Sequence, residues 1–337
     1  MKQAQHFKLF ASCIPIKGAL ESLIMDIENG QLFPIPNILL KVLKRNNHRT
    51  VAELKSYFKN NLNEGIDSYF TMFAENNLGF FTSDPASFPD IERTWKSPLQ
   101  ILNAVIEYAN TSSYSLEDCL QQLNSLGCEA IQIRILGKIE SRDFLEKLVS
   151  IQQSRIKYVE VFIDYINGLE ESQLKEIRDF DSRICKIIMY SSPFNKQLES
   201  KQSYYKDIFY YVEKNINEPC NETFSYEHFA VNVNTYTESK LHNIGLNRKI
   251  SIDQYGEIKN YLSHAKTFGN IKHLALEEII KSDAFQAKWF IHNDLIEKCR
   301  DCQFRYVCVS NSDLIKENGN YIKTSPCNFD PYTNTWN

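Results

Sequence analysis

Four cysteines near the end of the chain form the pattern with the clearest chemical meaning. Cys299 and Cys302 make a Cys-x2-Cys pair, Cys308 follows six residues after Cys302, and Cys327 follows 19 residues after that. A Cys-x2-Cys pair presents two thiolates from one tight turn, at a spacing that suits one metal ion or one edge of an iron–sulfur cluster. The spacing therefore predicts a metal or cofactor site with four thiolate ligands.

Four thiolates suit more than one metal. A [4Fe–4S] cluster and Zn2+ both accept such a ligand set, so Zn2+ is the rival to iron. Reduced thiols without a metal are the third interpretation, less expected for a clustered pair. The chain has nine cysteines, an odd number, and nothing indicates export, so a disulfide framework is not expected. The other five cysteines are expected to be small buried hydrophobic residues: Cys13, Cys119, Cys128, Cys185 and Cys220.

Other chemistry is not indicated by the sequence. No glycine-rich phosphate loop is present, and no histidine stands at catalytic spacing from a cysteine or an aspartate. His264 and His273 lie on polar segments, which predicts surface or supporting positions. No pair of nucleophile and base is visible, so we assign no catalytic residue.

Composition excludes several classes of protein. The chain has 337 residues, of which 43% are hydrophobic and 24% are charged, as in a typical globular protein. Its 38 Lys and Arg are outnumbered by 42 Asp and Glu, so no basic surplus is available for a nucleic acid. No apolar run reaches the ~18 residues that a membrane span needs, and the polar start is no signal peptide. We therefore expect a cytoplasmic protein without membrane or nucleic-acid partners.

The elements that must position the cysteines divide the chain into three predicted domains, at residues 1–90, 91–245 and 246–337. In the first, Asn29-Gly30 predicts a hairpin turn, and Thr50 with Glu53 predicts a helix capping box. Two further helices and a short strand at 80–82 complete a winged-helix-like pattern.

The middle part alternates strands with helices, which predicts βαβ units on a parallel sheet and an α/β fold. Strands are expected within 99–108 and over 130–136, 158–163 and 184–190, with helices from 115, 142 and 170. The polar stretch 196–206 is expected to be a solvated helix or loop. In the last part, a strand, a turn and a strand over 249–260 precede a helix over 275–281.

The N-terminal order of strands and helices, over roughly residues 5–85, resembles the RiPP recognition element. This module binds peptides in many enzymes that mature ribosomally synthesised peptides (RiPPs). The resemblance implies that the leader region of a precursor peptide adds a strand at the sheet edge beside the third helix. A plain structural cap with an aromatic core is the alternative.

The middle part resembles the partial barrel of radical SAM enzymes, but the motif that defines that family is absent. The family carries three cysteines after the first strand, where this chain has Ala-Asn-Thr-Ser-Ser-Tyr at 109–114. Those side chains cannot replace the thiolates of an iron–sulfur cluster. The resemblance therefore implies a degenerate barrel, with no cleavage of S-adenosylmethionine and no such cofactor.

The C-terminal part closely resembles the SPASM domain, a cysteine-rich domain of peptide-modifying radical SAM enzymes. Cys299, Cys302 and Cys308 match its Cys-x2-Cys-x5-Cys core and Cys327 its final cysteine. In the family these four hold the second of two auxiliary clusters. The positions that serve the first cluster hold other residues, among them Tyr261 and Ser312. The resemblance thus implies one [4Fe–4S] cluster.

Over nearly its full length the chain resembles the SPASM-domain peptide maturases of grasp-with-SPASM systems. The motifs that carry this resemblance are 7–10 with 13–19, 253–260, 268–271, 302–308 and the terminal 330–336. The resemblance implies a role in maturing a graspetide or bacteriocin-like precursor peptide, together with an ATP-grasp peptide ligase. The alternative is a non-catalytic scaffold or adaptor that a metal stabilises.

Overall fold

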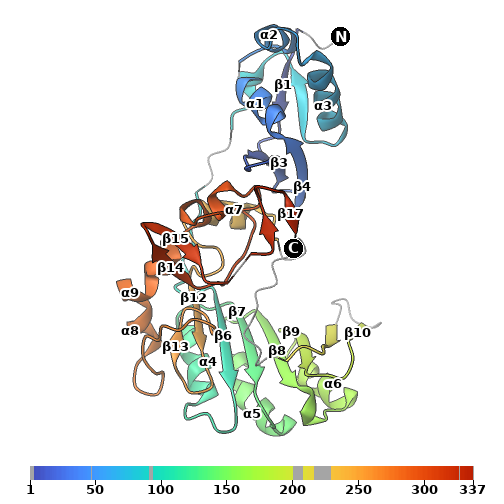
Figure 1. Cartoon of the computed structure of the whole chain (residues 1–337). Coiled ribbons are helices and arrows are strands. Elements are labelled where there is room, and N and C mark those ends of the chain that lie inside the picture. The colour runs from blue at the N-terminus through green and yellow to red at the C-terminus, as the bar shows by residue number, and fades with distance from the viewer. Residues whose placement is uncertain are drawn as a thin grey trace.

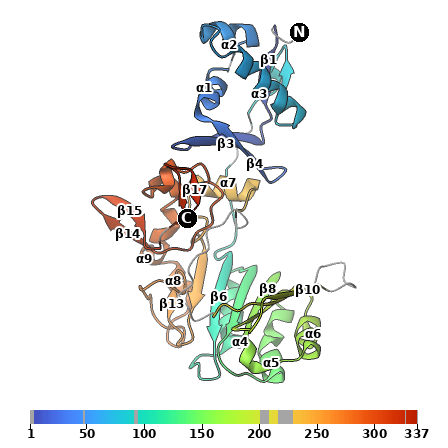
Figure 2. The same ribbon diagram turned by 45° about the vertical axis from the view of Figure 1, so that its right-hand side comes forward.

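The three parts of the chain follow a different order in space from their order in sequence. The computed structural model describes residues 4–46, 48–90, 94–199, 208–215, 229–325 and 327–336. Figure 1 shows the N-terminal elements at one end, the mainly parallel sheet with its helices at the other, and the C-terminal segment between them. The turned view in Figure 2 shows the same arrangement. The cysteine-rich segment therefore lies next to the N-terminal elements.

The N-terminal unit, residues 4–90, contains two small sheets and three helices. Strands β2 (Cys13–Ile16), β3 (Glu21–Asp26) and β4 (Gln31–Pro36) form one antiparallel sheet, and β1 (His6–Leu9) pairs with β5 (Gly79–Thr82). The helices are α1 (Asn37–Asn46), α2 (Val51–Tyr57) and α3 (Asn63–Glu75). Gly30 has a φ of +71° at the predicted hairpin turn, and Thr50 and Glu53 form the predicted capping box.

Strand β3 is buried on both faces. Ile24 packs in the apolar cluster that α1, α2 and α3 share. Leu23 and Met25 point to the opposite face, where they pack in one cluster with Phe304 and Phe329 of the C-terminal segment. Because alternate side chains of a strand point to opposite faces, this sheet joins its own helices to the cysteine-rich segment.

Both edge strands of the three-stranded sheet carry proline. Pro15 lies on β2, and Pro34 and Pro36 lie on β4. Proline has no N–H group, so neither edge offers an unbroken row of hydrogen-bond donors to another strand.

The middle of the chain forms an eight-stranded, mainly parallel sheet, which confirms the predicted α/β fold class. Its order is β10-β11-β9-β8-β7-β6-β12-β13, with β10 and β13 antiparallel to their neighbours. The central strands and their helices are β6 (Asn103–Tyr108), α4 (Leu116–Ser125), β7 (Ala130–Ile135), α5 (Ser141–Gln152), β8 (Tyr158–Asp164), α6 (Glu171–Phe180) and β9 (Ile184–Tyr190). Alternate strand residues pack with these helices in one core.

Two features differ from the sequence-based expectation. The stretch from 196, expected as a solvated helix or loop, begins with strand β10 (Lys196–Glu199), which pairs with β11 (Ile208–Tyr211). Its polar sequence fits because an edge strand needs few apolar side chains. In addition, β12 (Lys249–Ile252) and β13 (Ile258–Lys259) belong to the sheet, so the predicted boundary at 245/246 falls just before two of its strands.

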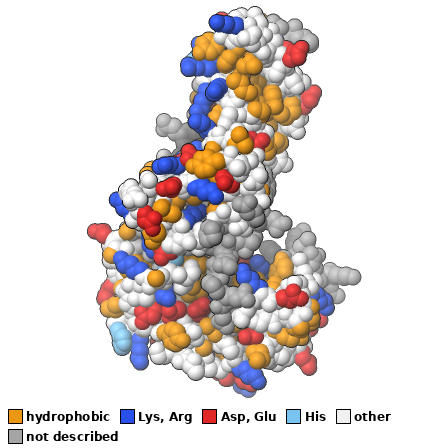
Figure 3. Space-filling view, in the orientation of Figure 1, with side chains coloured by type: hydrophobic (Ala, Val, Ile, Leu, Met, Phe, Trp, Pro, Cys, Tyr) orange, Lys and Arg blue, Asp and Glu red, His pale blue; other side chains and the backbone are white. Residues whose placement is uncertain are grey.

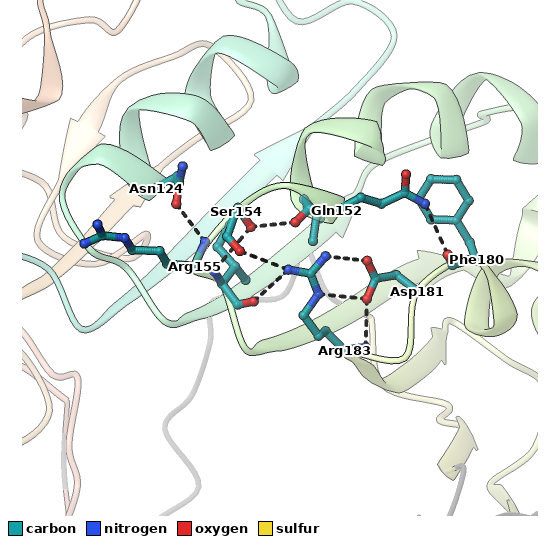
Figure 4. Close-up of polar contacts among 9 residues, drawn as sticks. Asn124, Gln152, Ser154, Arg155, Phe180, Asp181 and Arg183 are labelled. Atoms are coloured by element: carbon teal, nitrogen blue, oxygen red, sulfur yellow. Dashed lines mark hydrogen bonds and ion pairs between the residues drawn. The ribbon is translucent and has the colours of Figure 1, made fainter.

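Arg183 fastens the sheet to the ends of two helices. Its guanidinium contacts Asp181 at 2.5 and 2.8 Å and donates to the carbonyls of Ser154 and Ile156 at 3.2 and 3.1 Å (Figure 4). We expect Arg183→Met to lower the free energy of unfolding by about 2 kcal/mol, because it removes several charged hydrogen bonds from a partly buried site.

The control for this prediction is Arg142→Met, which breaks an exposed i,i+4 ion pair with Glu146. That change is expected to cost no more than about 0.5 kcal/mol. Urea unfolding of the two variants measures the difference, and equal losses would contradict the role of Arg183.

Candidate metal centre

The predicted Cys-x2-Cys turn is present. Cys299 opens the short 3-10 helix η6 (Cys299–Asp301), and the Cys302 amide donates to the Cys299 carbonyl at 3.0 Å. Lys298, directly before it, has a φ of +65°. After the turn, the Phe304 amide lies 3.4 Å from the Cys302 sulfur, and the Cys308 amide donates to the Phe304 carbonyl at 3.0 Å. These bonds fold the segment between the second and third cysteines back on itself.

Arg305 ties this loop to two other parts of the chain. Its Nε donates to Asp294 at 2.8 Å, and Nη1 donates to the Cys302 carbonyl at 2.8 Å and to the Lys17 carbonyl at 2.5 Å. The Tyr306 hydroxyl donates to the same Asp294 carboxylate at 3.1 Å. The contact with Lys17 reaches the N-terminal unit. Arg305 and Tyr306 are therefore positioning residues for the cysteine loop.

The four thiols share one region of the molecule. Each is half-buried, and Cys302 and Cys327 pack against the cluster that contains Leu23 and Met25, whereas Cys299 packs against a neighbouring cluster. Burial raises the pKa of the Cys302 thiol, and the nearby Cys308, Cys299 and Cys327 raise it further. The other three thiols therefore lie near enough to Cys302 to influence its charge.

The type of donor fits a thiolate-bound metal or cluster, because sulfur is a soft ligand and three further cysteines lie near enough to Cys302 to raise its pKa. Among the described residues, however, no three or more His, Cys, Asp or Glu side chains lie close enough to hold a metal ion. Binding therefore requires the four sulfur atoms to move closer together than they lie here.

The remaining cysteines do not join this region as far as the structure describes them. Cys13, Cys119 and Cys128 are buried, as expected. Cys185 is exposed, so the expectation of burial was wrong there; it lies where the register between β8 and β9 shifts, between the pairs Val159–Ile184 and Glu160–Lys186. Cys220 lies outside the described residues.

Tyr261 and Ser312, which stand where the SPASM pattern has cysteines, lie beside a buried polar network. His264 is only 1% exposed. Of the two positions predicted for it, the surface position was therefore wrong. Its Nε2 lies 2.8 Å from the Asn311 carbonyl, which only accepts, so Nε2 carries the hydrogen. Its Nδ1 accepts from the Lys288 ammonium at 3.4 Å, and Lys288 also pairs with Asp313.

Burial, together with the positive charge of Lys288, lowers the pKa of His264. An unfolded histidine takes up a proton as the pH falls through about 6.5, while the folded chain resists protonation of His264. The free energy of unfolding is therefore expected to fall as the pH is lowered from 7.5 to 5.5, and this fall should shrink in His264→Gln.

Urea unfolding at both pH values measures this effect. His273→Gln, which changes an exposed histidine of the same part of the chain, is the control. A pH dependence that is the same in His264→Gln and in the unchanged protein would contradict the assignment.

The face of the large sheet opposite the helices carries polar side chains that the sequence analysis did not single out. Arg134 is 5% exposed and contacts Gln132 at 2.8 Å and the Tyr261 hydroxyl at 3.5 Å. Burial raises the pKa of Glu107 on the neighbouring strand β6, while Arg134 opposes this rise. Polar and apolar residues alternate in β7, and this alternation could have predicted a polar face of the sheet.

Comparison with known proteins identifies part of this region. Residues 246–303 match the SPASM family, described as an iron-sulfur cluster-binding domain, and the match includes Cys299 and Cys302. The chain matches no curated protein.

Among solved structures, Streptococcus suis SuiB bound to S-adenosylmethionine is 12% identical with a TM-score of 0.36. The match covers 90% of this chain and 94% of the SuiB chain. The same protein bound to its precursor peptide SuiA is 11% identical over the same shares, with a TM-score of 0.32. The family match therefore identifies residues 246–303 as a SPASM domain, and Cys308 and Cys327 follow it in the sequence.

Proposed function

We propose that the protein takes part in the maturation of a ribosomally synthesised peptide, binding the precursor peptide and acting with an ATP-grasp ligase. The observation that carries the proposal is the SPASM match at residues 246–303, which places two of the four clustered cysteines in an iron–sulfur domain. The resemblance to grasp-with-SPASM maturases supports the finer parts, namely the ligase and the graspetide class. The proposal places the protein in the cytoplasm, where thiols remain reduced.

In this proposal Cys299, Cys302, Cys308 and Cys327 hold one [4Fe–4S] cluster. Such a cluster can carry single electrons and can fasten the segments that ligate it. Arg305 and Tyr306 orient the loop between Cys302 and Cys308 through Asp294. No S-adenosylmethionine chemistry is proposed, because the loop after β6 has no cysteine.

Metal analysis of anaerobically purified protein tests the cofactor. We expect about four iron atoms and four sulfides per chain with a broad visible absorption band, as for one [4Fe–4S] cluster. Stoichiometric zinc without visible absorption would overturn the iron assignment and leave the four ligands in place. About eight iron atoms would overturn the single cluster.

Calorimetry with the precursor peptide encoded beside the chain's gene tests the partner. Binding to the metal-loaded protein supports the proposal, and no binding in the presence or absence of the ligase contradicts it.

A metal-stabilised scaffold is the second candidate, and the packing of the cysteine loop against β3 favours it. The two candidates differ in what happens when the cluster is lost. If Cys302→Ala abolishes the peptide product while the fold is intact, the cluster has a chemical role. If the amount of product made by Cys302→Ala follows the amount of folded protein, the cluster acts only as a scaffold.

No helix in the described part of the chain has the length and apolar character needed to cross a lipid bilayer.

A further inference from the structure

A groove of about 620 Å³ lies between the N-terminal unit and helix α7 (Val233–Ser239). We call it the basic groove, because it is lined by Lys8, Lys44 and Lys240 together with two histidines. Among the described residues that line it, Asp90 is the one carboxylate. Figure 3 shows Lys and Arg side chains along one side of the N-terminal unit, with hydrophobic side chains beside them.

The lysines of the basic groove are poorly neutralised by the protein itself. Lys44 is exposed and Lys240 is half-buried, and neither forms an ion pair with a carboxylate of the described residues. The Lys240 ammonium instead lies 3.7 Å from the centre of the Tyr306 ring. Lys8 pairs with Asp90 at 3.5 Å, but that carboxylate is 93% exposed, so an incoming carboxylate can replace it at little cost. The groove therefore has the charge to attract carboxylates.

An exposed aromatic cluster extends from the groove. Phe10, which lines the groove, is 40% exposed and packs 5.2 Å from Phe80. Phe80 in turn packs 4.8 Å from Phe88, which is 46% exposed. Large exposed aromatic side chains that gather beside a charged groove are typical of surfaces that bind another chain.

The strand edges near the groove are poor templates for an added strand. Proline interrupts both edges of the three-stranded sheet, at Pro15 on one side and at Pro34 and Pro36 on the other. The Gln5 carbonyl, directly before β1, accepts from the Val51 amide at 2.9 Å, and the Phe7 carbonyl on β1 accepts from the Asn46 side chain. Recognition through side chains fits this region better than strand addition.

We propose that the basic groove binds an acidic segment of the precursor peptide, whose carboxylates pair with Lys44, Lys240 and Lys8 while an apolar side chain packs on Phe10. This inference rests on the proposed function, since it names the site and the chemistry of the peptide partner. It differs from the strand addition implied by the RiPP recognition element, because the contacts are made by side chains.

Matched charge reversals on one helix test the proposal. Lys44→Glu changes the groove, whereas Lys41→Glu makes the same change one turn earlier on α1, where the exposed Lys41 does not line the groove. Binding to the full metal-loaded protein is measured by fluorescence anisotropy. The probes are the precursor peptide, a Glu-rich peptide with phenylalanine anchors, and the same peptide with Gln for Glu.

Lys44→Glu is expected to weaken binding of the precursor and of the Glu-rich peptide by about tenfold, with a smaller effect of Lys41→Glu. Added salt should weaken binding as well. If the precursor binds equally well to both variants, the groove is not its site, although the proposed function stands. If the Gln peptide binds as tightly as the Glu peptide, acidic recognition is wrong. If no peptide binds, including the precursor, both proposals fail. If an oligonucleotide binds more tightly than the peptides and Lys44→Glu weakens that binding, the groove does not hold a peptide.

Discussion

Replacing Cys302 by alanine is expected to remove most of the bound metal. Cys302 is the candidate ligand whose pKa the other three thiols raise, and its sulfur accepts from the Phe304 amide at 3.4 Å. Structural zinc in zinc-finger peptides contributes about 10–16 kcal/mol of folding free energy, so the loss of one metal ligand is expected to outweigh any effect of the smaller side chain. Metal analysis and visible absorption of the purified variant measure the loss.

The effect should extend into the N-terminal unit. The cysteine loop contacts that unit through the cluster shared with Met25 and through the bond from Arg305 to the Lys17 carbonyl. Amide hydrogen exchange in β2 and β3 is therefore expected to become faster when the metal is lost.

Cys185→Ala is the matched control, since it makes the same change at an exposed cysteine of β9. It should retain the metal content of the unchanged protein. Full metal content in Cys302→Ala would contradict the four-ligand site. Loss of metal in Cys185→Ala would show that metal content reports general instability and not ligation.

Local features of this fold were predictable because their causes lie within a few residues. The capping box at Thr50 and Glu53, the hairpin turn at Gly30 and the strands of the βαβ units all depend on neighbouring side chains. The four candidate ligands can be proposed from the sequence for a similar reason, because the chemistry of thiolates and their spacing are visible in it.

Features that depend on distant partners were not predictable. His264 lies on a polar segment, yet it is buried because Lys288 and Asp313, 24 and 49 residues further on, complete its network. Likewise, the run from Leu23 to Met25 indicates a strand with two buried faces, but nothing in it identifies the cysteine loop as the second partner. The placement of the C-terminal segment between the other two parts is a matter of long-range packing (Figure 1).

Truncating neighbouring residues of β3 is expected to separate its two roles. Ile24 and Met25 are 0% and 1% exposed, so Ile24→Ala and Met25→Ala should each lower the free energy of unfolding by about 2–5 kcal/mol. Their side chains point to opposite faces, Ile24 to the helices of the N-terminal unit and Met25 to the cysteine loop.

Met25→Ala should therefore speed the release of metal to a chelator and hydrogen exchange at 302–308. Ile24→Ala should speed exchange in α1 and α3 while the metal stays in place. Because the two variants lose similar stability, a difference in metal release reports the contact itself; equal release would show that the sheet does not support the metal centre.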